Sequence, residues 1–134
     1  MYLTQLDLKK KKLFLDLSIH AAISNNSFDD EQKAIVDSYC IEMGLVKSKY
    51  SPSKGLDEVI QELKGTCTLK ELNIILIEIT SLIMGDGTYD MLERDFMKKI
   101  QFVFDISDEK IEKTLVAINQ LLKAYKMLNE VIED

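Results

Sequence analysis

The stretch GDGTYDMLERD, residues 85–95, holds carboxylates whose spacing could bind a cation. Asp86 and Asp90 lie four positions apart, and Glu93 follows three positions later. Carboxylate oxygens are the ligands that hard divalent cations prefer. The stretch departs from the EF-hand pattern, because position 6 counted from Asp86 is Met91 rather than glycine. These residues predict a weak site for Ca²⁺, Mg²⁺ or Mn²⁺, with Asp86, Asp90 and Glu93 as the metal ligands.

The same stretch also has a purely structural interpretation. Asp90-Met91-Leu92-Glu93 has the form of a capping box, in which side chains satisfy the free amides at a helix start. A phosphate loop is excluded, because the sequence lacks GxxxxGK[ST] and GxGxxG, and a carboxylate would repel phosphate. Capping explains Asp90 and Glu93 but leaves Asp86 without a role, so both interpretations stay open.

His20, the only histidine, marks a second candidate site. Asp16 precedes it by one helical turn, so the two side chains share a helix face. A small helical enzyme would need a deep pocket lined by both groups. Zinc chemistry would need at least three converging ligands, and a di-iron bundle would need two Glu-x-x-His pairs, which the sequence lacks. A structural or surface histidine is the simpler interpretation, and we expect no enzymatic activity.

Composition limits the classes of partner. The 134 residues, 46% hydrophobic, fit a single domain over 1–134. A net charge of −6 argues against nucleic acid, which needs clustered cations, and against an anionic membrane surface. The sequence has no apolar run of about 18 residues and no signal-peptide pattern at its start. With two cysteines, Cys40 and Cys67, outside any CxxC motif, a reduced, cytoplasmic protein is the simplest interpretation.

Apolar residues at helical spacing predict an all-α fold, a compact bundle of about six to seven helices. The predicted helices cover about residues 8–24, 29–43, 69–84, 90–104 and 108–131, with a short helix that starts near Leu56 and stops at Gly65. The isoleucine-rich segment 69–84 could be mistaken for a strand, but its length and 3-4 spacing favour a central, buried helix. Thr68 and Glu71 form a capping box at its start, and Gly44 suits a left-handed cap.

The last predicted helix, 108–131, carries a long apolar stripe with a 4-3 rhythm: Ile111, Leu115, Ile118, Leu122 and Tyr125. Met127, near its end, is expected to fill a gap in the core. The end of this helix could instead join two copies of the chain. A ligand-free, dimerising structural bundle is therefore a further alternative, and the chain is expected to be a monomer or a homodimer.

Shifting the sequence by sixty-one positions aligns two helical hairpins, about 8–45 and 69–106. The shift places Asn25 on Asp86, Asn26 on Gly87, Phe28 on Tyr89, Asp29 on Asp90 and Gln32 on Glu93. Each hairpin reads as an apolar helix, a small polar turn, an aromatic residue, an aspartate and an amphipathic helix. Neither hairpin covers its own apolar face, so a pseudo-twofold bundle is expected. The first turn has lost one carboxylate and should bind cations less well.

The two repeated segments resemble the TerB-like family, which is named for a bacterial tellurite-resistance protein. They are FLDLSIHAAISNNSFDDEQKAIVDSYCIEMGL (14–45) and LIEITSLIMGDGTYDMLERDFMKKIQFVFDIS (76–107). The family repeats an apolar helix that ends in Asp-Gly, an aliphatic or aromatic residue two positions later, and an acid that starts the next helix. The matching residues are Asp86, Gly87, Tyr89 and Glu93, while Asn25, Phe28 and Gln32 match only loosely.

The resemblance implies a cytoplasmic bacterial protein with an all-α fold and a role in stress-linked complexes. The family is associated with tellurite and phage resistance, with divalent-metal sensing and with J-domain chaperone modules, and it has no accepted enzymatic activity. The resemblance therefore implies a non-enzymatic interaction or sensing domain for a stress response. It also implies a protein partner and weak binding of a divalent cation through the acidic turn.

Overall fold

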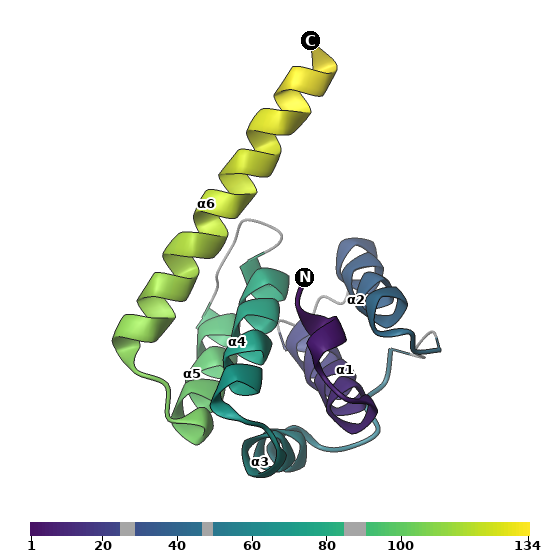
Figure 1. Ribbon diagram of the computed structural model, residues 1–134, viewed down its shortest axis with the longest axis vertical. Helices are drawn as coiled ribbons and strands as arrows, with labels where there is room; N and C mark the ends of the chain where they lie inside the picture. The colour runs from purple at the N-terminus through teal and green to yellow at the C-terminus, as the bar shows by residue number, and fades with distance from the viewer. Residues whose placement is uncertain (25–28, 47–49, 85–90) are drawn as a thin grey trace.

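A computed structural model describes residues 1–24, 29–46, 50–84 and 91–134 (Figure 1). In these residues every regular element of secondary structure is a helix, which confirms the predicted all-α bundle. The elements are η1 (Leu3–Gln5), α1 (Leu8–Ile23), α2 (Asp30–Met43), α3 (Leu56–Thr66), α4 (Leu69–Met84), α5 (Met91–Phe104) and α6 (Asp108–Glu133).

The helix bounds repeat with the predicted offset. Helices α1 and α4 each have 16 residues, and α2 and α5 each have 14. Both bounds of α4 lie 61 positions after those of α1, and both bounds of α5 lie 61 positions after those of α2. Two helical hairpins of the same dimensions are therefore present, separated by α3.

Both hairpins end in the same backbone motif. Gly44 after α2 has φ 69°, and Asp105, its equivalent after α5, has φ 56°. In each case the next amide donates to the carbonyl oxygen five residues back, at 2.9 and 3.0 Å. Aspartate is among the few residues with a side chain that tolerate this left-handed region. The shared geometry explains why both helices stop at equivalent positions although only one has glycine there.

The starts of α1 and α4 also correspond. The Asp7 carboxylate accepts the Lys10 amide at 3.0 Å, and the Thr68 hydroxyl accepts the Glu71 amide at 3.2 Å. Glu71 in turn accepts the Thr68 amide at 2.9 Å, which confirms the predicted capping box. The Lys10 ammonium bonds the Glu71 carboxylate at 3.0 Å. Equivalent residues of the two hairpins thus contact each other, as residues near a twofold axis do.

Helix α4 lies at the centre of the bundle. It contacts α1, α5, α6 and η1, while α1 also packs on α2 and α3 (Figure 1). Nine of its 16 residues are buried, namely Leu72, Ile74, Ile75, Leu76, Glu78, Ile79, Thr80, Leu82 and Ile83. The prediction of a central, buried helix for the isoleucine-rich segment is confirmed.

The predicted end of α3 is wrong by one residue. The helix continues through Gly65 to Thr66, and Cys67 then takes an extended conformation. The Cys67 amide still donates to the Leu63 carbonyl oxygen at 2.9 Å. Gly65 has no positive φ, so the glycine takes an ordinary helical conformation and does not stop the helix.

Helix α6 differs from the other helices because it extends beyond them (Figure 1). Its 26 residues span about 39 Å, whereas the 16 residues of α4 span about 24 Å. Ile118 is its only buried residue. Tyr125 and Met127 are 55% and 66% exposed, so the predicted core role of Met127 is wrong.

Candidate functional site

The predicted metal ligands lie at the junction of α4 and α5. Asp86 and Asp90, like Asn25 and Asn26 of the first hairpin, fall outside the described residues. Glu93 belongs to the first turn of α5, where its side chain is only 1% exposed and is not without a partner. In the described part of the chain, no three His, Cys, Asp or Glu side chains converge as a metal site would require.

The burial of Glu93 has a counterpart in the first hairpin. Gln32, 61 positions earlier, is 7% exposed at the corresponding place in α2. The Asp29 carboxylate accepts the Gln32 amide at 2.8 Å, so it caps α2. A buried polar side chain at the same position of both hairpins indicates a shared structural role. Glu93 differs by carrying an acid, whose burial costs free energy unless a partner compensates it.

The second candidate pair, Asp16 and His20, holds a connection in place. Asp16, 8% exposed, accepts the Ser53 amide at 3.0 Å. The His20 ring donates from Nε2 to the Lys54 carbonyl oxygen at 2.8 Å. Their one-turn spacing therefore fixes two successive residues of the chain against α1. These hydrogen bonds give both side chains a structural role.

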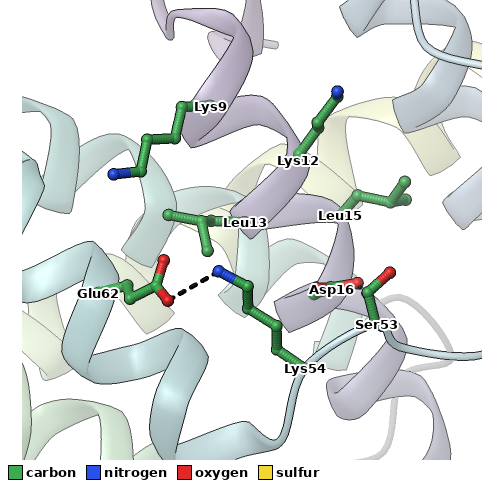
Figure 2. Close-up of a pocket in the computed structure, with 8 residues that line it drawn as sticks. All are labelled: Lys9, Lys12, Leu13, Leu15, Asp16, Ser53, Lys54 and Glu62. Carbon is green, nitrogen blue, oxygen red and sulfur yellow. Dashed lines mark hydrogen bonds and ion pairs between the residues drawn. The ribbon is translucent and has the colours of Figure 1, made fainter.

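A pocket of about 300 Å³ lies beside this connection (Figure 2). Its lining residues are Lys9, Lys12, Leu13, Leu15, Asp16, Ser53, Lys54 and Glu62. An ion pair of 2.7 Å joins Lys54 to Glu62 in its wall. Asp16 reaches this pocket, but His20 is not part of its lining. The deep pocket lined by both groups, which an enzyme at Asp16 and His20 needs, is not found among the described residues.

A cluster that sequence reasoning did not anticipate anchors the first residues of the chain. The Met1 amine lies 2.9 Å from Glu78 and 3.0 Å from Glu42. The Tyr2 amide donates to Glu78 at 3.0 Å, and the Leu3 amide donates to Glu42 at 2.9 Å. Burial lowers the pKa of the Met1 amine, but the hydrogen bonds to both carboxylates outweigh it and raise the pKa above 8.0.

The same cluster continues into the core through Tyr39. The Tyr39 hydroxyl donates to the backbone carbonyl oxygen of Glu78 at 3.0 Å. Burial, and then the negative charges of Glu78 and Glu42, raise the pKa of this hydroxyl far above its ordinary value. No local sequence motif indicates this cluster, because Tyr2 and Glu78 are 76 positions apart in the sequence.

The outer half of α6 exposes an apolar helix face in the described part of the chain. All residues from 123 to 134 are exposed. One helix face, here called the outer stripe, consists of Ala124, Tyr125, Leu128, Val131 and Ile132. Its four large side chains are 55%, 59%, 71% and 77% exposed. The charged residues Lys123, Lys126, Glu130 and Glu133 recur at 3-4-3 spacing on the opposite face.

Comparison of the chain with protein-family models, curated proteins and solved structures finds no match. The TerB-like resemblance therefore stays a prediction. Among the helices in the described residues, none combines the length and the apolar character needed to cross a membrane.

Proposed function

We propose that the chain is a non-enzymatic, TerB-like interaction domain that binds a protein partner through the outer stripe of α6. The observation that supports the proposal is the exposure of four large apolar side chains on one face of a helix that extends beyond the bundle. Their spacing of i, i+3, i+6 and i+7 follows one side of a helix, which is how helices present anchors to a partner.

Covering the outer stripe with a partner would lower the free energy, because it removes apolar surface from water. Each square ångström of apolar surface removed from water contributes about 25 cal/mol. A helical segment of about twelve exposed residues is marginal in water, because helix stability normally comes from packing an apolar face. A partner on the outer stripe would supply that packing. Large contiguous apolar patches on soluble proteins commonly mark such interaction sites.

Weak binding of a divalent cation by Asp86, Asp90 and Glu93 belongs to the same proposal, as does a role in a cytoplasmic stress response. The cation rests on the spacing of these carboxylates and on the TerB-like resemblance, and the stress response rests on the resemblance. Glu93, at the start of α5, is the one proposed ligand within the described residues, and its side chain is buried.

Photo-crosslinking in the cells that naturally produce the chain tests the protein-binding proposal. A photoreactive amino acid replaces Leu128 on the outer stripe, and Lys126 on the opposite face is the matched control. The proposal predicts a crosslinked product from position 128 and little from position 126. Equal products from both positions, or none from either, would contradict it.

A further inference from the structure

We infer that the partner bound by the outer stripe is a second copy of this chain, whose α6 lies antiparallel across a twofold axis near Leu128. This inference rests on the proposed function and adds the identity of the partner. An isologous pair needs a surface that is complementary to itself. If a residue i of one copy contacts a residue j of the other, then j of the first copy also contacts i of the second. The outer stripe meets this requirement in spacing, side-chain size, area and charge.

The spacing of the stripe is symmetric about Leu128. Tyr125 and Val131 lie three positions to either side, and Ala124 and Ile132 lie four positions to either side. In an antiparallel pair, Tyr125 of one copy therefore meets Val131 of the other, and Ala124 meets Ile132. Both of these contacts join a larger side chain to a smaller one, which helps two helices pack closely, and Leu128 meets its own copy on the axis.

The exposed area limits the pair to a weak dimer. With Met127 at its edge, the stripe offers roughly 600 Å² of apolar surface in each copy, given side chains that are 55–77% exposed. Complete coverage of this surface in two copies would bury roughly 1,200 Å² in total, which is the lower bound for specific interfaces. We therefore expect association that depends on protein concentration rather than a permanent dimer.

Charge favours the antiparallel arrangement. The charged residues Lys123, Lys126, Glu130 and Glu133 lie on the face away from the seam, so the pair buries none of these charges. Each copy has a net charge of −6. Antiparallel helices place the two acidic bundles at opposite ends, whereas parallel helices would place them side by side. Antiparallel helices also oppose their dipoles.

Sedimentation of the purified chain over a range of concentrations is the first test. The inference predicts a mass that rises from one copy to two as concentration increases. Leu128→Glu should abolish the rise, and Asn119→Glu, which adds the same charge on the opposite face of α6, should leave it intact. Both positions are exposed, so both variants should keep the helical content of the parent chain.

Disulfide trapping in a Cys67→Ser background then tests the geometry. Leu128→Cys should form a covalent dimer on mild oxidation, and Lys126→Cys should not. Tyr125→Cys mixed with Val131→Cys should give a mixed dimer more readily than either variant alone. If Val131→Cys links to itself as readily as Leu128→Cys, the antiparallel arrangement is wrong.

A mass of one copy at every concentration up to millimolar would overturn self-pairing. In that case the crosslinks formed in cells separate the two proposals. A product at position 128 with a mass other than two copies keeps the proposed function and replaces the partner. No product at position 128 overturns the proposed function as well.

Discussion

Helices α4 and α6 carry similar apolar spacing but have opposite surroundings. Nine of the 16 residues of α4 are buried, whereas α6 has one buried residue among 26. Helices α1, α5 and α6 cover α4, while α6 packs mainly on α4 and then extends past it (Figure 1). Apolar spacing therefore predicts which face of a helix seeks a partner, but the neighbouring elements decide whether the chain itself supplies one.

The largest expected effect comes from the buried side of this comparison. Ile75 in α4 is 0% exposed, and Ile75→Ala should lower the free energy of unfolding by about 2–5 kcal/mol. Ile132 in α6 is 77% exposed, and Ile132→Ala should change it by less than about 0.5 kcal/mol in dilute solution. Urea denaturation measures both, and similar losses would show that α6 is covered within one copy.

The contacts of Glu78 with Met1 and Tyr2 extend the comparison to the polar side of α4. Glu78→Ala removes the acceptor of the Tyr2 amide and an ion partner of Met1, and it should lower the free energy of unfolding by about 1–3 kcal/mol. Glu42→Ala should cost less, because Glu42 is 28% exposed and Glu78 is 2% exposed. A larger loss for Glu42→Ala than for Glu78→Ala in urea denaturation would contradict a role for Glu78 as the main anchor.

Alkaline pH should weaken the same anchor. The pKa of the Met1 amine is raised in the folded state. The contribution of the amine to the free energy of unfolding is therefore complete below pH 8.0 and is lost as pH rises through the raised pKa. The ion pair is partly solvated, so the loss should be about 0.5 kcal/mol. A chain acetylated at Met1 is the control. The stability difference between the two chains should shrink from pH 7 to pH 9.5, and a constant difference would argue against the amine.

The smallest effect is expected at the turn that follows α4. A divalent cation that binds only the folded chain stabilises it by about 0.4 kcal/mol when its concentration equals its dissociation constant. Millimolar Ca²⁺, Mg²⁺ or Mn²⁺ should therefore raise the melting temperature slightly, and Asp86→Asn should remove the rise. If no cation shifts the melting temperature, or if the variant shifts equally, the cation proposal fails.

Much of the fold could be predicted because its determinants are local. Thr68 and Glu71 define the start of α4 by side-chain capping, and Gly44 defines the end of α2 by its left-handed backbone. The sixty-one-position repeat is visible in the sequence because both hairpins place apolar and capping residues at equivalent positions. The burial of Gln32 and Glu93 at equivalent positions follows from that repeat, although a polar residue type gives no sign of it.

The sequence did not reveal features that depend on distant contacts. Glu42 and Glu78 bind the first residues of the chain because the fold brings them together, and neither shows a recognisable motif. The pairing of His20 with a backbone carbonyl, rather than with Asp16 in a pocket, depends on the path of residues 53 and 54. Apolar spacing does not show where the bundle ends, so the core position predicted for Met127 is wrong.

Hydrogen exchange of the purified chain at low and high protein concentration tests the central claim most directly. Amides in α4 should be protected at both concentrations, because that helix is covered within one copy. Amides of residues 123–133 should exchange quickly in dilute solution and become protected at high concentration, and Leu128→Glu should remove that protection. Equal exchange of residues 123–133 at both concentrations would contradict the pairing of two copies through the outer half of α6.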